Sequence, residues 1–165
     1  MIEMLRVSKA FGGQSVLNDL DLVIPGGKIT AVIGPSGEGK SVLLRHIIGL
    51  MKPDAGRVII DGEDITHMGR RDLNRVREKF GMLFQNVALF DSMTVFENVA
   101  FPLEEKTRLT RSEIRDRVHE ALEHVGLKDV DRKYPDQLSG GMKKRVGLAR
   151  ALLLNPRIIL FDEPT

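Results

Sequence analysis

The sequence predicts a three-layer α/β fold with a parallel-sheet core, a small antiparallel β region near the N-terminus and a helical insert. Three observations support this prediction. Short apolar runs alternate with helical patterns, and a glycine-rich loop joins one such run to a helix. Residues 86–142 then show the apolar spacing of amphipathic helices. With 165 residues, the chain is long enough to form one domain with a real core.

The N-terminal part provides the predicted antiparallel strands and the first strand of the core. Residues 2–7 and 20–24 are predicted strands, and a turn at 25–27 leads into an apolar run at 29–33. We expect this run to be a buried strand. A helix should follow the glycine-rich loop. Its expected inner face consists of Val42, Leu43, Leu44, Ile47 and Ile48.

The next elements are short. A strand is predicted at 57–60, and the turn residues Asp61 and Gly62 should end it. Residues 71–79 have the composition of a short polar helix. Residues 80–84 are predicted to form a buried strand, after which a loop leads to the helical insert.

The helical insert is expected to open with two capped helices. Thr94 with Glu97, and Thr110 with Glu113, match the capping box that begins a helix. Pro102 should end the first helix, because proline cannot donate the helical hydrogen bond. The second helix should bury one apolar face. The residues of that face are Ile114, Val118, Ala121, Leu122 and Val125.

The remaining pattern predicts one more helix and one more strand. Gly126 should end the second helix of the insert. A further helix is predicted from 140 to 154, and the dipeptide Asn155-Pro156 should stop it. Residues 157–161 are predicted to form the last buried strand.

The composition excludes several classes of protein. A net charge of +2, spread along the chain, is too small for a nucleic-acid-binding surface, so we expect no nucleic-acid partner. The chain has no cysteine and therefore no disulfide framework. It shows neither a signal peptide nor an apolar run long enough to span a membrane. If the protein works at a membrane, another chain must supply the spanning helices.

The loop at 34–41 matches the phosphate-binding pattern G-x-x-x-x-G-K-[ST] without a mismatch. Its backbone N–H groups can surround anionic oxygens, and the helix that follows adds a partial positive charge. Lys40 should reach the β- and γ-phosphates of ATP, and the Ser41 hydroxyl should ligate Mg²⁺. The alternative is a glycine-rich turn that only joins a strand to a helix. The predicted nucleotide-binding residues of the loop are Gly34, Pro35, Ser36, Gly37, Glu38, Gly39, Lys40 and Ser41.

The last predicted strand ends in two acids, Asp162 and Glu163. Parallel strands in nucleotide-binding folds deliver their carboxyl ends to the ligand crevice. Asp162 should therefore hold Mg²⁺, through water, while Glu163 polarises the water that attacks the γ-phosphate. The alternative is an ordinary buried strand that ends in an acid.

A second glycine-rich segment, Leu138-Ser139-Gly140-Gly141-Met142, precedes a predicted helix. A serine and two glycines at a helix N-terminus can form a second anion site. The alternative is an ordinary helix cap made by Ser139.

Taken in this order, the phosphate loop, L-S-G-G and the strand ending in D-E-P-T closely resemble the ATPase subunit of ATP-binding cassette (ABC) transporters. The resemblance covers the whole chain and implies a P-loop NTPase with a RecA-like parallel-sheet core. It implies a single incomplete ABC ATPase domain over 1–165, with a nucleotide-binding core at 1–85 and 143–165. The helical subdomain with the signature motif would then be 86–142.

The resemblance also implies roles for individual residues. Gln85 corresponds to the glutamine that contacts Mg²⁺ or the attacking water and relays the nucleotide state to the membrane subunits. It joins Lys40 and Glu163 as a catalytic residue. Phe11 lies where the family places an aromatic ring on adenine, although a core phenylalanine is the alternative. Two subunits would form a head-to-tail dimer, in which Ser139, Gly140 and Gly141 clasp the γ-phosphate bound by the partner's Lys40.

The segment after Gln85 and the signature form L-S-G-G-M-x-K-R resemble the ATPases of Mla-type transporters, which move phospholipid between the membranes of Gram-negative bacteria. This implies integral membrane permease subunits as partners and a peripheral position on the cytoplasmic face of the inner membrane. Four apolar side chains could form the docking surface, or they could pack the insert internally. They are Leu89, Phe90, Phe96 and Phe101.

The chain also departs from the family pattern. Glu38 stands where many relatives have a small residue, and we expect it to point to solvent. Met142 replaces a common glutamine. The family continues beyond Thr165 into a D-loop, a strand and a histidine that contacts the γ-phosphate. We therefore expect a truncated domain that binds nucleotide weakly and turns over ATP slowly or not at all.

Alternatives to phospholipid transport follow from the same motifs. The cassette could serve another importer, of amino acids or metal chelates. It could be a nucleotide-dependent switch without transport, as in ABC relatives that act on DNA or ribosomes, although those usually carry large insertions or fused cassettes. It could also be a nucleotide-binding fragment without turnover.

Overall fold

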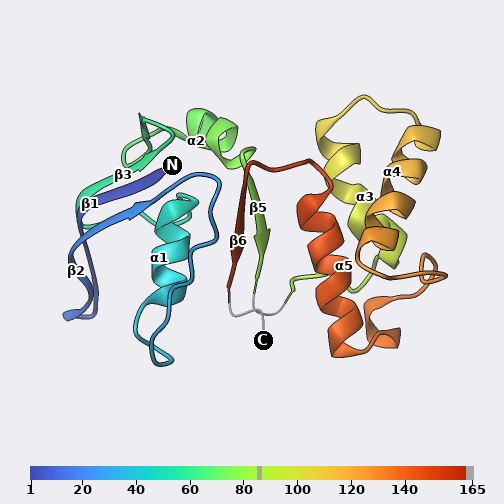
Figure 1. Ribbon diagram of the computed structural model, residues 1–165, viewed down its shortest axis with the longest axis horizontal. Helices are drawn as coiled ribbons and strands as arrows, with labels where there is room; N and C mark the ends of the chain where they lie inside the picture. The colour runs from blue at the N-terminus through green and yellow to red at the C-terminus, as the bar shows by residue number, and fades with distance from the viewer. Residues whose placement is uncertain (85–86, 163–165) are drawn as a thin grey trace. The chain divides into compact units, whose positions relative to one another are not determined.

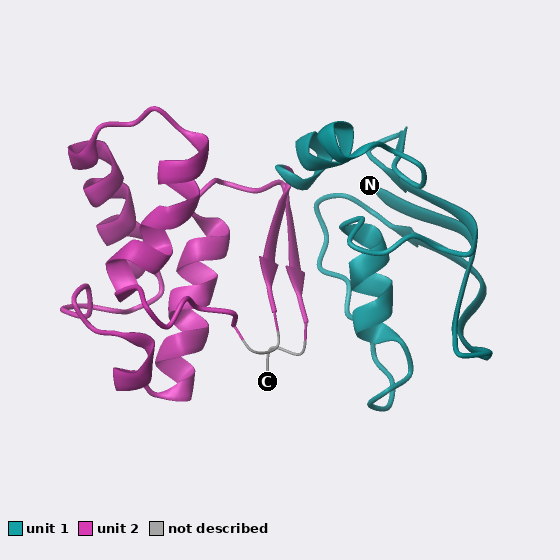
Figure 2. Ribbon diagram, turned by 180° about the vertical axis from the view of Figure 1, so that it is seen from behind, with its two compact units in different colours: residues 1–78 teal, residues 79–165 magenta. Residues whose placement is uncertain are grey.

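The computed structural model of the chain describes residues 1–84 and 87–162. Helices and strands alternate along the sequence, as the α/β prediction requires (Figure 1). The chain forms two compact units, Met1–Glu78 and Lys79–Thr165, which Figure 2 shows in different colours. We call them unit 1 and unit 2. The domain boundaries expected from the sequence remain a prediction.

Unit 1 contains a four-stranded antiparallel sheet in the order β2-β1-β3-β4. Its strands are β1 (Ile2–Phe11), β2 (Gln14–Ile24), β3 (Ala55–Ile60) and β4 (Glu63–Asp64). Gly12 and Gly13 join β1 to β2 with φ angles of 54° and 84°, which suit the two-residue hairpin turn. Asp61 and Gly62 join β3 to β4 in the same way. The predicted antiparallel region is thus confirmed, although β1 and β2 extend beyond the predicted ranges 2–7 and 20–24 and the two-residue strand β4 was not predicted.

Two helices complete unit 1. Helix α1 (Lys40–Ile47) buries Leu43 and Ile47 as predicted, but its third buried residue is His46. The helix packs against β3. Helix α2 (Arg70–Arg77) buries Leu73 and Val76. The Arg77 guanidinium donates to the carbonyls of Ile48 and Gly49, at 3.2 and 2.8 Å. It thus provides hydrogen-bond donors for carbonyls at the C-terminal end of α1.

The strand predicted at 29–33 is wrong. This segment has no strand assignment, and no strand of the β2-β1-β3-β4 sheet pairs with it. Ile29 and Ile33 are almost fully exposed. A strand requires a neighbouring strand to accept and donate its backbone hydrogen bonds, and apolar side chains alone do not provide one.

Unit 2 contains a parallel pair of strands, β5 (Phe80–Leu83) and β6 (Ile158–Phe161). Phe80 pairs with Ile158, and Leu83 pairs with Phe161. Both strands lie within one residue of their predicted bounds. Helix α5 (Gly140–Leu152) packs against β5. The contact is close at Gly81, where an added Cβ would lie 2.5 Å from the carbonyl oxygen of Ala151.

Three helices, α3 (Val95–Lys106), α4 (Arg111–His124) and α5, form the helical part of unit 2 and pack on one another. Both predicted capping boxes are present, at Thr94 and Thr110. Gly126 follows α4 with a φ of 70°, as expected of a helix terminator. The predicted end of the first helix at Pro102 is wrong. Helix α3 continues for another turn, because the burial of residues such as Leu103 outweighs the one missing hydrogen bond.

The core of unit 2 lies between these helices. Val95, Val99 and Leu103 of α3 meet Ile114, Val118 and Leu122 of α4, and Val146 and Ala149 of α5 fill the space between them. The apolar face predicted for α4 is therefore the face that packs. A short 3-10 helix, η1 (Pro135–Gln137), leads into α5.

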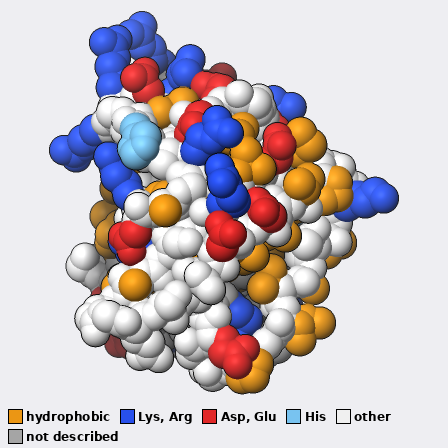
Figure 3. Space-filling view, turned by 90° about the vertical axis from the view of Figure 1, so that its left-hand side faces the viewer, with side chains coloured by type: hydrophobic (Ala, Val, Ile, Leu, Met, Phe, Trp, Pro, Cys, Tyr) orange, Lys and Arg blue, Asp and Glu red, His pale blue; other side chains and the backbone are white. Residues whose placement is uncertain are grey.

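The surface is mixed in charge. On the face shown in Figure 3, Lys and Arg side chains lie beside Asp and Glu side chains, and hydrophobic side chains reach the surface between them. Among the residues that the structure describes, no helix combines the length and the apolar character needed to cross a membrane.

Candidate functional site

The predicted site residues are divided between the two units. The phosphate loop and Phe11 lie in unit 1, and Asp162 and the Ser139–Gly141 segment lie in unit 2. Gln85 and Glu163 lie outside the described residues.

The phosphate loop enters α1 through two glycines with left-handed backbone angles. Gly37 has a φ of 86°, and Gly39, the N-cap of α1, has a φ of 89°. Gly39 is also buried, and an added Cβ would lie 2.8 Å from Cγ1 of Val16. Any other residue would therefore meet both backbone strain and a collision at this position. The carbonyl of Gly39 accepts the backbone N–H of Leu43 at 2.8 Å, so the loop leads directly into the first helical turn.

The Lys40 side chain lies back over the loop that precedes it. Its Nζ donates to the carbonyl of Gly34 at 2.8 Å and to the carbonyl of Pro35 at 2.7 Å. An ammonium group has three N–H donors, so one remains for a ligand. The loop thus holds a positive charge next to the N-terminus of α1, where backbone N–H groups and the helix dipole also favour an anion. This arrangement is suited to binding phosphate.

Glu38 places a negative charge near the same loop. The side chain is exposed, as expected, and its Oε2 lies 3.3 Å from the position that a Cβ on Gly34 would occupy. A phosphate bound close to this carboxylate would be repelled unless the Glu38 side chain turned away.

Two described residues can provide oxygen ligands for Mg²⁺. Ser41 lies in the first turn of α1, directly after Lys40 in the sequence. Asp162 follows β6, is 7% exposed and donates its backbone N–H to the carbonyl of Leu83 at 3.0 Å. Within the described residues, no group of three or more His, Cys, Asp or Glu is arranged to hold a metal ion. Mg²⁺ at nucleotide sites needs only one or two protein ligands besides phosphate and water, so the hydroxyl of Ser41 and the carboxylate of Asp162 are each a suitable kind of ligand.

Phe11 lies at the end of β1 and is 45% exposed, so the alternative of a core phenylalanine is wrong. The Nζ of Lys9 lies 5.6 Å from the centre of the Phe11 ring. Lys9 also donates to Asp54 at 2.6 Å, and this bond, with a second one from the N–H of Ala10, holds the pKa of Asp54 below its ordinary value. The ring thus has an exposed face and a cationic neighbour, which suit stacking on a flat ligand.

The serine of L-S-G-G is the N-cap of α5. Its Oγ accepts the backbone N–H of Met142 at 3.3 Å, so the helix-cap interpretation of Ser139 is confirmed. Gly140 and Gly141 are exposed, and an added Cβ at either position would have no heavy atom within 4 Å. The glycines are therefore not required by packing within the described chain. They leave the N-terminus of α5 open.

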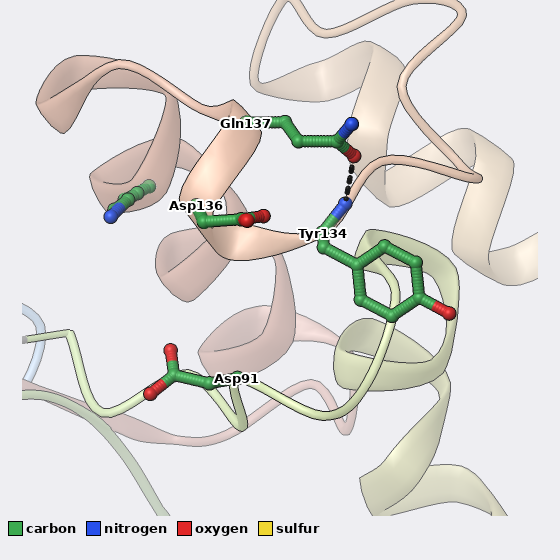
Figure 4. Close-up of a pocket in the computed structure, with 5 residues that line it drawn as sticks. Asp91, Tyr134, Asp136 and Gln137 are labelled. Carbon is green, nitrogen blue, oxygen red and sulfur yellow. Dashed lines mark hydrogen bonds between the residues drawn. The ribbon is translucent and has the colours of Figure 1, made fainter.

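A hollow of about 490 Å³ lies beside this helix start (Figure 4). Its walls come from the loop before α3, from η1 and from α5. In Figure 4 the backbone N–H of Tyr134 donates to Oε1 of Gln137, at 2.8 Å, across the top of η1. No residue of the phosphate loop lines the hollow, so it is distinct from the phosphate loop. Its lining residues are Asp91, Tyr134, Asp136, Gln137 and Lys143.

The apolar side chains predicted to dock a membrane partner differ in how far they are buried. Leu89 and Phe96 are partly buried and pack against the core of unit 2. Phe90 is 42% exposed, and its ring lies 5.1 Å from that of Phe101. Internal packing therefore accounts for part of the segment and leaves the Phe90 ring as its exposed part.

Sequence reasoning missed two residues that organise this segment, Asn98 and Arg150. Asn98 is fully buried in α3, and the Arg150 side chain extends from α5 to the loop that contains Val87 and Ala88. The signal for Asn98 was present, because it is a polar residue on the otherwise apolar face between Val95 and Val99. Nothing in the local sequence distinguishes Arg150 from the exposed arginines.

Comparisons with known proteins find relatives that match nearly the whole chain. The family model for ABC transporters matches residues 17–165. The chain is 50% identical over 163 residues to the probable ribonucleotide transport ATP-binding protein mkl of Mycobacterium tuberculosis. The match covers 99% of this chain and 45% of that protein. It is 46% identical over 164 residues to the intermembrane phospholipid transport system ATP-binding protein MlaF of Escherichia coli, covering 99% of this chain and 61% of that protein.

A solved structure has the same fold. It is the dimeric, post-hydrolysis state of the ATP-binding cassette MJ0796 bound to ADP and Pi, which superposes with a TM-score of 0.92 and 38% identity. The match covers 100% of this chain and 75% of that one. This chain spans about half the length of the curated relatives that it matches. Because the family model covers most of the chain, the chain belongs to the ABC transporter family.

Proposed function

We propose that this chain is the ATP-binding and ATP-hydrolysing part of a transporter subunit, and that the transporter moves phospholipid. The observation that carries the proposal is the phosphate loop, with its two left-handed glycines and with the Lys40 ammonium held on the carbonyls of Gly34 and Pro35. Such a loop presents a fixed positive charge and backbone N–H donors to a polyphosphate before any ligand arrives.

Each site residue has a place in the proposed reaction. The exposed ring of Phe11 stacks on adenine, and Lys40 donates its remaining N–H to the phosphates. Ser41 and Asp162 would be the ligands of Mg²⁺, which would supply positive charge that stabilises the phosphates. Glu163 accepts a proton from the attacking water, and Gln85 contacts that water or the metal. The roles of the last two residues rest on the family motif alone.

A second subunit completes the proposed site. The Ser139 Oγ accepts the backbone N–H of Met142 in the N-cap of α5, so the hydroxyl hydrogen would make its contact with a phosphate. Gly140 and Gly141 offer open backbone N–H groups. In a head-to-tail dimer these groups of one subunit meet the γ-phosphate bound by Lys40 of the other.

Integral membrane subunits are the other proposed partners. The exposed Phe90 ring lies against Phe101, and an apolar side chain of a permease helix could cover it. We therefore propose a peripheral position for the subunit on the cytoplasmic face of a bacterial inner membrane. Phospholipid is the favoured cargo because the segment around Phe90 resembles Mla-type ATPases and the chain is 46% identical to MlaF. The 50% identity to mkl makes ribonucleotides the second candidate.

The proposal is tested with the protein purified from its native source together with the membrane proteins that accompany it. Binding of a fluorescent ATP analogue and release of phosphate are measured for the wild type, Lys40→Ala and Lys28→Ala. Lys28 is an exposed lysine just before the loop and serves as the matched control. We expect Lys40→Ala to abolish phosphate release and Lys28→Ala to retain it. Equal rates in the wild type and Lys40→Ala would refute the proposal.

Cargo is tested separately, after reconstitution into vesicles. Labelled phospholipid and a labelled ribonucleotide are supplied in turn, with ATP or without it. ATP-dependent movement of the lipid supports the first candidate, and movement of the nucleotide supports the second.

A further inference from the structure

The loop that follows Gln85 in the sequence has strained backbone angles. Val87 and Ala88 have φ angles of 57° and 49°, although neither is glycine. Left-handed angles of this kind are energetically unfavourable in non-glycine residues. They persist only where the surroundings hold the backbone in place, so the loop needs specific restraints.

Arg150 of α5 provides the first restraint. Its Nη2 donates to the carbonyls of both strained residues, Val87 at 2.8 Å and Ala88 at 2.9 Å. Its Nη1 lies 3.4 Å from Oδ1 of Asn98, and its Cζ lies 5.9 Å from the centre of the Phe90 ring. Burial lowers the pKa of Arg150, but the guanidinium stays charged at neutral pH because its ordinary value is so high. These are charge-assisted bonds, which are stronger than neutral ones.

Asn98 of α3 provides the second restraint. Its Nδ2 is 3.0 Å from the carbonyls of Phe90, Met93 and Thr94, and its Oδ1 accepts the backbone N–H of Phe90 at 2.8 Å. The side chain is fully buried, so each of these bonds is protected from water. Together with Arg150, Asn98 fixes the backbone at both ends of the segment 87–94.

Packing provides the third restraint, and it comes from the same helix as Arg150. Gly147 of α5 lies under Val87 so closely that an added Cβ would collide with the Val87 side chain and lie 2.8 Å from Cδ1 of Leu83. Val87 is buried. The helix thus holds Val87 by its side chain, through Gly147, and by its carbonyl, through Arg150.

Helix α5 carries Ser139–Gly141 at its other end. Eleven residues separate Ser139 from Arg150, which is about 16 Å along a helix. We propose that Arg150 is a positioning residue, and this inference rests on the proposed function. With the support of Asn98, Arg150 makes the segment 87–94, which contains Phe90, move together with α5. When the partner's nucleotide contacts the N-terminal end of α5, Arg150 would then transmit the movement of this helix to the segment 87–94.

The experiment compares two arginines of α5. Arg150→Met keeps the length and apolar stem of the side chain but removes its donors. Arg145→Ala is the matched control, because Arg145 is exposed and donates at 3.4 Å to the carbonyl of Val125. Arg150→Lys is the conservative variant, and it can restore one of the two carbonyl bonds. ATP affinity, kcat, the transition temperature and a probe of the loop are measured in the protein purified with its membrane partners.

The loop probe uses a label on Ser92→Cys, since these 165 residues contain no cysteine. We expect an immobilised label in the wild type and in Arg145→Ala, and a mobile label in Arg150→Met even without nucleotide. ATP affinity should change by less than about twofold, because the described contacts of Arg150 are with unit 2 residues and none is with the phosphate loop. Loss of both charge-assisted carbonyl bonds in Arg150→Met should lower kcat by about tenfold, and Arg150→Lys should recover part of it.

Three results would overturn the proposal. The first is a label that stays immobile in Arg150→Met, and the second is an unchanged kcat in that variant. The third is a loss of kcat shared equally by Arg145→Ala, which would indicate a general loss of stability. If the wild type neither binds nor hydrolyses ATP, the proposed function fails, whereas the nucleotide-free label still reports whether Arg150 holds the loop.

Discussion

Two glycines of α5 should respond in opposite ways to the same substitution. Gly141 lies in the first turn, where an added Cβ has no heavy atom within 4 Å. Gly147 lies further along, where an added Cβ collides with the Val87 side chain and lies 2.8 Å from Cδ1 of Leu83. Alanine at Gly141 therefore changes only the backbone preference, while alanine at Gly147 also overpacks the contact between α5 and the loop.

The magnitudes follow from these environments. Alanine is favoured over glycine in a helix by up to about 1 kcal/mol, so Gly141→Ala should raise the free energy of unfolding by about 0.5–1 kcal/mol. Overpacking of a dense contact costs about 1–3 kcal/mol, so Gly147→Ala should lower it by that amount. If Gly141 faces the partner's phosphate, as proposed, its added methyl group should also slow ATP hydrolysis by about tenfold, the loss of one phosphate contact.

Urea unfolding and phosphate release together test this reasoning. Tyr134 is the only tyrosine of the chain, which has no tryptophan, so tyrosine fluorescence reports on unit 2. We expect Gly141→Ala to be more stable and less active than the wild type. A Gly141→Ala protein with full activity would refute the role of this glycine in phosphate binding. A Gly141→Ala protein less stable than the wild type would refute the structural argument.

Two further predictions concern the helical part of unit 2. Pro102→Ala should raise the free energy of unfolding by about 1–2 kcal/mol, because Pro102 gives the Asn98 carbonyl no helical hydrogen bond, and thermal unfolding measures this. The Thr110 hydroxyl and then its backbone N–H, each 2.7 Å from Glu113, lower the pKa of that carboxyl below 4.5. A lowered folded-state pKa gives stability that is present above the unfolded value and lost as the pH falls through the folded one. Glu113→Gln should therefore flatten the acid side of the stability profile, and an unchanged acid side would contradict this.

Local signals in the sequence predicted most elements of the fold. The capping boxes at Thr94 and Thr110 begin helices because they act through residues three positions apart. The turn of Asp61 and Gly62 is equally local. Pro102 shows where such reasoning ends, because the cost of a proline is local, whereas the burial that outweighs it comes from α4 and α5.

The strand predicted at 29–33 failed for a related reason. Its apolar residues are typical of a buried strand, but strand formation depends on a partner elsewhere in the chain. The sheet of unit 1 contains two hairpins, β1-β2 and β3-β4, which depend on their own turns, and the pairing of β1 with β3 joins them. Where pairing was local, as in β1 and β2, the prediction was confirmed. The strands β5 and β6 were also predicted, since both runs are bounded by clear turn and helix signals, but their pairing with each other was not.

The same distinction explains which site residues the sequence could reveal. The phosphate loop and L-S-G-G are contiguous, so their spacing alone indicates an anion site at a helix N-terminus. Arg150 acts on residues more than sixty positions away, and its partners are backbone carbonyls, which have no sequence identity at all. No motif could name those partners. A buried asparagine such as Asn98 is the best available sign, because a polar side chain on an apolar helix face must find its hydrogen bonds in a neighbouring loop.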